Sequence, residues 1–334
     1  MKKIVLLTTG GTIASVESDD GLKPDLTGED LIEHIPEAAE ICELKSEPVL
    51  LRGAVKGVDS TNIQPDDWVE IAKAAYKGLK NCDGVVITHG TDTMAYTSAM
   101  LSFMLTGLDK PVILTGSQRP MSDPSTDAKK NLLDALRTAV EGYPGIYIVF
   151  GGRIIKGTKA SKIHTTAIKA FDSINAPVSG KINEKDIVMK YPLPPGTGGV
   201  KLDINILKDV FLLKLIPGIN PDIIDKIVSM GCKGIVIEAF GLGGLPNEGR
   251  DLLKPIRNAI EKDVLVVAMT QCRNGITDLS DYEVGRKALD TGIIPVSNMT
   301  AEAAVTKLMW ALGHTSEPEK VKEMMQKDFC GELS

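Results

Sequence analysis

The sequence lacks the features that would assign it to a membrane, secreted or nucleic-acid-binding class. No apolar stretch approaches the roughly 18 residues of a membrane span, and the apolar run 4–7 is too short for a secretory signal. Basic runs are absent, and the net charge is −6 with a pI near 5.4. Because a nucleic-acid partner requires a basic face, we expect a soluble cytoplasmic protein with no membrane or nucleic-acid partner.

Cysteine is also scarce and has no pattern. The five residues are widely spaced and form no C-x-x-C pair: Cys42, Cys82, Cys232, Cys272 and Cys330. An odd number at such spacing fits neither a disulfide framework nor a zinc site. We therefore expect reduced, mostly buried thiols and no bound metal.

What is present is an alternation of short apolar runs and amphipathic segments. Runs of four to seven residues, rich in Val and Ile and apolar on both faces, are typical of parallel strands covered by helices on both sides. They lie at 4–7, 84–88, 111–115, 145–150, 210–216, 234–239 and 264–269. Helices are predicted between them, as at 65–79 and 221–231, where Pro and acidic residues open an apolar pattern with helical spacing.

The length of 334 residues exceeds the roughly 250–300 at which one core stops growing, so two domains are expected. Between 191 and 205 the sequence YPLPPGTGGVKLDIN has three Pro and three Gly, which should continue neither helix nor sheet. We predict an α/β fold with a larger N-terminal catalytic domain (1–190), whose mainly parallel sheet is flanked by helices. A linker (191–209) and a smaller C-terminal α/β domain (210–334) follow.

The first expected strand runs into a threonine-bearing turn, TTGGTIAS at 8–15. In a parallel sheet the ligand lies at the carboxyl ends of the strands, so a Gly-Gly turn there brings backbone close to it. The spacing matches neither a dinucleotide fingerprint nor a phosphate-binding P-loop. Thr12 is the natural nucleophile, and the alternative is a tight turn in which Thr12 only caps a helix.

A second such turn, HGTDT at 89–93, precedes an apolar helix expected at 94–105. A Thr hydroxyl is a weak nucleophile and needs a base within hydrogen-bond reach, itself oriented by a third group. Asp92 can orient such a base. His89 is a base by composition, but a lone His between strand and Gly is more often a packing residue. Alternatively, Thr91 and Asp92 cap the following helix.

The polar segment 157–177 supplies candidate bases. It contains, or directly follows, four lysines and one histidine: Lys156, Lys159, Lys162, Lys169 and His164. Most of the lysines should form a solvated face, and the residues alone select none. A Lys near a carboxylate acts as a base when partial burial lowers its pKa.

A third polar stretch lies just before the helix expected at 65–79. Asp59, Ser60 and Thr61 sit where a helix N-terminus favours an anionic or zwitterionic ligand. They are equally compatible with plain turn residues ahead of Pro65. We treat all three as candidate substrate contacts, together with Gly11 and Gly90 of the two threonine-bearing turns.

These blocks together resemble the bacterial-type L-asparaginase family, closest to its cytoplasmic type I branch. The match is an ordered set from residue 4 almost to the end: TTGGTIAS, VDST, ITHGTDTMAYT, VILTGSQRP, DAKKNLLDAL, GTKASKIHTTAIKAFDSINAP, KLIPG, NMTAEAAVTKLMWALG and GELS. The resemblance implies hydrolysis of the side-chain amide of L-asparagine to L-aspartate and ammonia, without metal or organic cofactor. It also implies a homodimer or dimer of dimers in which a neighbour's C-terminal domain completes each site.

The resemblance further implies roles for single residues. Thr12 is the nucleophile, and Thr91, Asp92 and Lys162 form a second triad. Asp59 and Ser60 bind the substrate's α-amino and α-carboxylate groups, and backbone N–H groups near Gly11 and Thr91 hold the developing oxyanion.

One position departs from the family pattern. Leu22 stands in a mobile segment where a Tyr is common, and it has no hydroxyl to offer Thr12. The stretch 16–30 is polar and turn-rich, so we predict a mobile loop that acts as a lid, or else a plain surface loop.

Two other functions stay open. An asparaginase-like subunit of archaeal tRNA-dependent amidotransferases shares these motifs, but it should carry an extra N-terminal domain and a surface for tRNA, whereas this chain is acidic and its first strand is expected at residue 4. A non-catalytic small-molecule binding module is the other. The sequence also leaves open whether the substrate is asparagine or glutamine, since one methylene changes the free energy that discriminates two substrates by only about 1–3 kcal/mol. The sequence also does not decide whether the protein is a dimer or a tetramer, or whether it has an effector site.

Overall fold

The computed structural model describes residues 1–54, 56–184 and 186–333, and Ser334 of the closing GELS block lies outside them. The chain divides into two compact units, Met1–Ile204 and Asn205–Ser334. The division falls within 191–209, and the role of that stretch as a linker stays a prediction. One detail of it is wrong: Lys201–Leu202 (β14) pairs with Leu105–Thr106 (β6), so the Pro- and Gly-rich stretch does return to strand once the glycines end.

The N-terminal unit is built on an eight-stranded sheet in the order β13-β12-β9-β8-β7-β5-β1-β4. The strands from β4 to β8 pair in parallel, and β9, β12 and β13 are antiparallel additions. The strands are β1 (Lys3–Thr8), β4 (Glu43–Pro48), β5 (Gly84–Thr88), β7 (Pro111–Thr115), β8 (Gly145–Phe150), β9 (Arg153–Lys156), β12 (Gly180–Ile182) and β13 (Ile187–Met189). The predicted mainly parallel sheet is confirmed.

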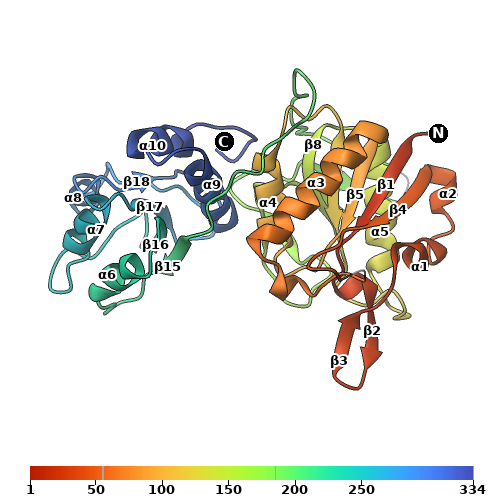
Figure 1. Ribbon diagram of the computed structural model, residues 1–334, viewed down its shortest axis with the longest axis horizontal. Helices are drawn as coiled ribbons and strands as arrows, with labels where there is room; N and C mark the ends of the chain where they lie inside the picture. Colours follow the sequence, from red (N-terminus) through yellow and green to blue (C-terminus); the bar gives the residue numbers. More distant parts are fainter. Residues whose placement is uncertain (55, 185, 334) are drawn as a thin grey trace. The chain divides into compact units, whose positions relative to one another are not determined.

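Helices cover both faces of this sheet (Figure 1). On one face α3 (Pro65–Asn81) packs on β1 and β5 and against α4 (Met94–Met104), and on the other α5 (Ala128–Glu141) covers β5, β7 and β8 beside α1 (Gly28–Glu33) and α2 (Ala38–Ile41). The sequence explains α3 well: Pro65 fills its first position, a capping box closes its N-terminus, and its apolar stripe is buried. β5, β7 and β8 are buried at every position, which is why they read as continuous apolar runs.

The strand order of this sheet reverses at one place. Numbered along the chain, the parallel strands follow the order 2-1-3-4-5, so the chain passes from β1 to β4 on one side and then from β4 back past β1 to β5 on the other. In doubly wound sheets the ligand binds at the carboxyl ends of the strands where this reversal occurs. TTGGTIAS follows β1 and HGTDT follows β5, so both threonine-bearing turns lie at the reversal point.

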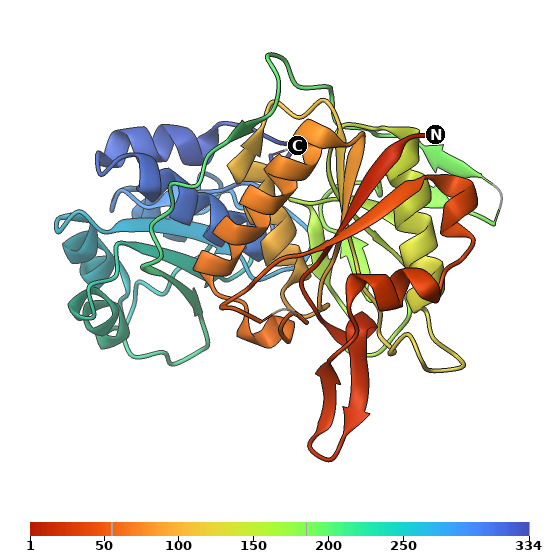
Figure 2. The ribbon, with the colours of Figure 1, turned by 45° about the vertical axis from the view of Figure 1, so that its right-hand side comes forward.

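Two hairpins extend from the N-terminal unit. The segment predicted as a mobile loop contains β2 (Ser15–Ser18) and β3 (Gly21–Pro24), an antiparallel pair that projects from the end of the sheet where β1 terminates (Figure 2). A loop is therefore the wrong description of residues 15–24, which form paired strands, and a role as a lid stays a prediction. The second hairpin joins β10 (Ala160–Lys162) to β11 (Phe171–Ser173).

The C-terminal unit has a four-stranded parallel sheet in the order β15-β16-β17-β18, with bounds Val210–Lys214, Gly234–Ala239, Leu265–Thr270 and Ile294–Pro295. Its helices are α6 (Asp222–Ser229), α7 (Leu253–Ile260), α8 (Glu283–Leu289), α9 (Ala301–His314) and α10 (Pro318–Gln326). The expectation that the run 210–216 is covered on both faces is wrong, because β15 is an edge strand and Phe211 is 37% and Ile216 61% exposed.

Two further expectations concern the whole chain. All five cysteines are free thiols, but only Cys42 and Cys232 are buried, so the expectation of mostly buried thiols is wrong. Over the described residues, no helix combines the length and the apolar character needed to cross a bilayer.

Candidate active site

Three turns meet at the carboxyl ends of β1 and β5. Thr9 N donates to Thr88 O (3.1 Å), which links the turn after β1 to the end of β5. The loop that carries VDST joins them, since Val58 N donates to Thr9 O (2.9 Å) and Gly11 N donates to Val58 O (3.2 Å). Residues from three separate parts of the sequence are thus fixed around one point by backbone hydrogen bonds.

Glycines allow these turns to touch backbone to backbone. Gly11 has φ +84°, and a Cβ there would lie 2.3 Å from Gly90 N. A Cβ on Gly90 would lie 2.5 Å from Ser60 Oγ. No larger residue fits at either position without moving backbone. The two glycines predicted as substrate contacts therefore have a structural reason as well, because their contact sets the following residues, Thr12 and Thr91, in adjacent turns.

Neither Thr12, nor Thr91 with Asp92, is the residue that caps the following helix. The N-cap of the 3₁₀ turn η1 (Thr12–Ala14) is Gly11, and the N-cap of α4 is Thr93, which makes no side-chain capping bond. The alternative that Thr12, or Thr91 with Asp92, serves as a helix cap is wrong. Thr12 is only partly buried, so its hydroxyl stands in an accessible turn.

Thr91, Asp92 and Lys162 form one hydrogen-bonded group. Lys162 Nζ donates to Thr91 Oγ1 (2.7 Å) and to Asp92 Oδ1 (2.7 Å), across 71 and 70 residues of sequence. Thr91 is buried, while the side chains of Lys162 and Asp92 are 18% and 56% exposed. The group combines a hydroxyl, an amine and a carboxylate in contact, which is the arrangement that proton transfer to or from a hydroxyl requires.

The β10–β11 hairpin explains why Lys162 is selected from the four lysines. Lys162 is the last residue of β10 and pairs with Phe171, whose ring packs edge-on against Phe150 at 5.1 Å between centroids. Lys159 is fully buried, which contradicts the solvated face expected for most of these lysines. Lys169 and His164 are exposed. Only the strand register could distinguish them, and it is invisible in the sequence.

The VDST loop lies against the HGTDT turn. Asp59 caps the short 3₁₀ turn η2 (Ser60–Asn62), and its Oδ1 accepts from Thr61 N at 2.8 Å. Ser60 is buried, and its Oγ accepts from Asp92 N at 3.3 Å. Asp59 and Thr61 are not buried. The structure thus brings Ser60 into the group around Asp92 and leaves Asp59 and Thr61 at its open side, where their contact with a substrate stays a prediction.

His89 is not the base that composition suggested. It is 1% exposed, and both ring nitrogens are engaged: Nδ1 lies 2.7 Å from Gly90 O and Nε2 lies 2.9 Å from Thr97 Oγ1. Thr97 Oγ1 also accepts from Trp68 Nε1 at 3.0 Å. Burial lowers the pKa of His89 to about 4, which keeps the ring neutral at pH 7. Sequence reasoning missed Trp68 and Thr97, which look like ordinary interior positions of α3 and α4.

The remaining features add little chemistry. Leu22 lies on β3 and is 53% exposed.

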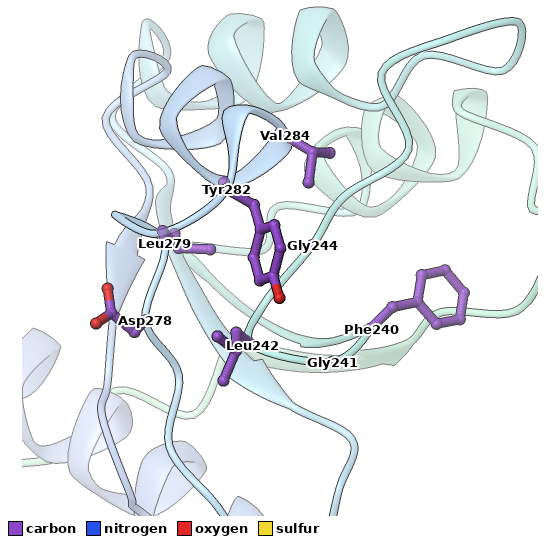
Figure 3. Close-up of a pocket in the computed structure, with 9 residues that line it drawn as sticks. Phe240, Gly241, Leu242, Gly244, Asp278, Leu279, Tyr282 and Val284 are labelled. Atoms are coloured by element: carbon purple, nitrogen blue, oxygen red, sulfur yellow. The ribbon is translucent and has the colours of Figure 1, made fainter.

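The C-terminal unit has a hollow of about 430 Å³ beyond the ends of β16 and β17, lined by Phe240, Gly241, Leu242, Gly244, Asp278, Leu279, Tyr282, Val284 and Gly285 (Figure 3). The carboxylate of Asp278 is turned away from Tyr282 there and accepts from Ser280 Oγ at 2.6 Å. Within the described part of the chain, no three His, Cys, Asp or Glu side chains are grouped to hold a metal ion.

The fold and the site define a class of protein: one with a doubly wound sheet, threonine-bearing turns at its reversal point and a Lys–Thr–Asp group beside them. Two known family models match this chain. The family described as Asparaginase, N-terminal matches residues 3–195, and the Glutaminase/Asparaginase C-terminal domain matches residues 209–325. The chain belongs to the asparaginase family, and the resemblance predicted from its motifs is confirmed.

Individual relatives agree with this assignment. The chain is 41% identical to the L-asparaginase of Thermococcus kodakarensis over 99% of both chains, and the solved structure of the thermostable L-asparaginase from that organism superposes with a TM-score of 0.92 at 39% identity, covering 99% of each. L-asparaginase I from Vibrio cholerae has a TM-score of 0.88 at 32% identity over 100% of this chain and 99% of that one. A component of the glutamyl-tRNA(Gln) amidotransferase of Pyrococcus abyssi is 40% identical over all of this chain and 77% of its own length.

Proposed function

We propose that this protein is an L-asparaginase of the type I branch, an amidohydrolase that converts L-asparagine to L-aspartate and ammonia. The observation that carries the proposal is the contact of Lys162 Nζ with Thr91 Oγ1 and Asp92 Oδ1, both at 2.7 Å, beside the turn that bears Thr12. Full-length similarity to L-asparaginases supports it. The enzyme acts without metal or organic cofactor, with a side activity on L-glutamine.

The chemistry runs through two displacements. Thr12 Oγ1 attacks the side-chain amide carbon, its proton leaves for a base, and the amide nitrogen departs as ammonia after it gains a proton. Water then attacks the Thr12 ester and releases L-aspartate with the free hydroxyl. Lys162 takes and returns the proton through Thr91, and Asp92 orients the amine. The two hydrogen bonds of Lys162 Nζ support this assignment.

Backbone donors stabilise the negative charge that develops on the carbonyl oxygen in each displacement. The N–H groups near Gly11 and Thr91 are the proposed donors, supported by the backbone contact between Gly11 and Gly90. Asp59 and Ser60 bind the α-amino and α-carboxylate groups, and Thr61 borders them. We also propose a cytoplasmic homodimer or dimer of dimers in which a second protomer completes each site.

The decisive experiment measures ammonia release from L-asparagine by the wild type and by Thr12→Val, which removes the hydroxyl and keeps the side-chain shape. Thr138→Val is the matched control, since Thr138 is fully buried in α5 and its hydroxyl donates to Asp134 O at 2.7 Å. We expect Thr12→Val to lose activity and Thr138→Val to keep it. Equal release by wild type and Thr12→Val, or no release by either, overturns the proposal.

The amidotransferase component is the second candidate, favoured by the 40% identity over the whole chain. The same assay separates the two functions. An asparaginase releases ammonia from free L-asparagine with no other protein present. Release that requires a partner protein and tRNA would favour the amidotransferase.

A further inference from the structure

A buried chain of hydrogen bonds leads from α3 to the HGTDT turn. Trp68 Nε1 donates to Thr97 Oγ1 (3.0 Å), Thr97 lies 2.9 Å from His89 Nε2, and His89 Nδ1 lies 2.7 Å from Gly90 O. Trp68 is 6% exposed, Thr97 is fully buried and His89 is 1% exposed. The chain therefore connects the interior between α3 and α4 to one carbonyl of the turn.

Only one arrangement of protons satisfies every member. Gly90 O accepts, so the His89 Nδ1 carries a hydrogen and donates it. In the neutral ring Nε2 is then an acceptor, which takes the single hydroxyl proton of Thr97. That leaves the lone pairs of Thr97 Oγ1 for the Trp68 N–H. Burial lowers the pKa of His89 to about 4, so this arrangement persists at neutral pH.

The Gly90 carbonyl, at which this series of hydrogen bonds ends, belongs to the same peptide group as the Thr91 N–H. A trans peptide is planar, and its C=O and N–H point in opposite directions. Because the Gly90 carbonyl points at the buried His89 ring, the Thr91 N–H points away from the interior. Gly90 has no Cβ to restrict rotation of this peptide, and a Cβ there would meet Ser60 Oγ at 2.5 Å. The orientation of this peptide therefore depends on a hydrogen bond and not on steric restriction by a side chain.

The other side of Thr91 is held separately. Asp92 N donates to Ser60 Oγ (3.3 Å), and Thr93 Oγ1 donates to Ser60 O (2.8 Å). The Thr91–Asp92 peptide and the Thr93 side chain are thus tied to the VDST loop. The Gly90–Thr91 peptide is tied through His89.

We propose that Trp68, Thr97 and His89 are positioning residues that hold the Gly90–Thr91 peptide with its N–H directed at the carbonyl oxygen of the substrate. This inference rests on the proposed function, since an oriented N–H matters when charge develops on that oxygen. Loss of one such donor lowers kcat by about 10²–10³-fold, because the donor acts mainly in the transition state. Removing the support should therefore lower kcat while KM changes little.

Kinetics of matched variants test this. His89→Leu removes the donor to Gly90 O, whereas His89→Asn keeps an amide N–H near the position of Nδ1. We expect kcat to fall by about 10²-fold in His89→Leu and by less than about 10-fold in His89→Asn, each with KM close to the wild-type value. Thr97→Val and Thr97→Ser form a second pair that tests the same chain if His89→Leu does not fold. Thr138→Val again serves as the control.

A measurement that needs no activity completes the test. The backbone amide of Thr91 is followed by NMR in protein labelled with ¹⁵N-threonine. We expect its chemical shift to move in His89→Leu and to return toward the wild-type value in His89→Asn. An unchanged Thr91 amide in folded His89→Leu, or an unchanged kcat, overturns the inference. A wild type without asparaginase activity refutes the proposed function instead, and the amide shift still decides whether His89 positions the peptide.

Discussion

Among the lysine–carboxylate pairs of the protein, one in each unit has the same contact distance, and these two pairs differ in burial. Lys162 Nζ and Asp92 Oδ1 are 2.7 Å apart in the N-terminal unit, and Lys307 Nζ and Glu332 Oε1 are 2.7 Å apart in the C-terminal unit. The side chains of the first pair are 18% and 56% exposed, whereas both side chains of the second are 0% exposed. The first pair is accessible to water, whereas the second pair contacts only protein.

The buried pair is fully occupied by structural partners. Lys307 Nζ also donates to the carbonyls of Met325 and Lys327, and Glu332 accepts from the N–H groups of Phe329 and Cys330. These bonds fold the last residues of the chain back onto α9. A buried charge is tolerated only with such partners, so this pair is committed to the fold.

The exposed pair has a different third partner. Lys162 also contacts the Thr91 hydroxyl, and Asp92 remains open to solvent. An ion pair at the surface contributes little to stability, with a median of about 0–1 kcal/mol. The two pairs have the same contact distance, so burial and the third partner of the lysine distinguish them: a side-chain hydroxyl at Lys162 and backbone carbonyls at Lys307.

The largest expected effect is on activity, at the exposed pair. Lys162→Met should lower kcat/KM for L-asparagine by about 10³-fold or more, because the base is lost, while the free energy of unfolding changes by less than about 1 kcal/mol. Lys169→Met is the control, since Lys169 is exposed in the same segment. Steady-state kinetics and denaturant unfolding of both variants provide the measurement. Comparable losses of activity in the two variants would contradict the assignment.

The second prediction concerns stability, at the buried pair. Glu332→Gln leaves the Lys307 charge buried and unpaired, which should lower the free energy of unfolding of the C-terminal unit by about 3–5 kcal/mol. Fluorescence of Trp310, 5.0 Å from the Phe329 ring, follows this unit in a Trp68→Phe background. The double variant Lys307→Met/Glu332→Leu should regain most of the loss. A Glu332→Gln protein as stable as its parent would show that the pair does not secure the tail.

The third prediction distinguishes the units by pH. His89 has a folded pKa of about 4 against an ordinary 6.5, so the unfolded chain binds more protons between these values. The free energy of unfolding of the N-terminal unit should fall as pH drops from 6.5 to 4, by on the order of 3 kcal/mol, and no further below 4 on this account. Trp68 fluorescence in a Trp310→Phe background measures it. His89→Asn should remove this slope, and an unchanged slope would exclude His89 as its source.

The smallest expected effect isolates the contact between the turns. Gly11 and Gly53 have φ of +84° and +77°, so Ala is strained at both, but a Cβ at Gly53 meets nothing within 4 Å. Gly11→Ala should therefore cost about 1–3 kcal/mol of stability beyond Gly53→Ala. Thermal or denaturant unfolding of the two variants gives the difference. Equal costs would mean that the turns do not need their close approach.

Much of this molecule can be predicted because its signals are local. The strands at 84–88, 111–115, 145–150 and 234–239 have the predicted bounds, since buried parallel strands appear as unbroken apolar runs. The strand at 210–214 is present, but the prediction that both its faces are buried is wrong, because the exposure of an edge strand depends on neighbours far along the chain. The prediction of a loop at 15–24 is wrong because these short polar strands contain no apolar run that would indicate them.

The site divides in the same way. Thr12, Thr91 and Asp92 can be nominated from turns that follow strands, and Lys162 only through the family resemblance. His89 is an ambiguous candidate until its two hydrogen bonds show that it faces the interior. No sequence signal marks Thr97, or the Lys307–Glu332 pair, as more than helix and tail residues.

The sequence by itself determined the fold class, most of the buried parallel strands and the residue types available for chemistry, because apolar periodicity and turn residues act over a few positions. Only the tertiary structure decided which of several lysines meets Thr91, which glycines bring two turns together and which lysine is buried with Glu332. The first of these outcomes depends on strand order and register, which bring Lys162 to Thr91 and Asp92 across some 70 residues, and the others depend on how turns and the C-terminal tail pack.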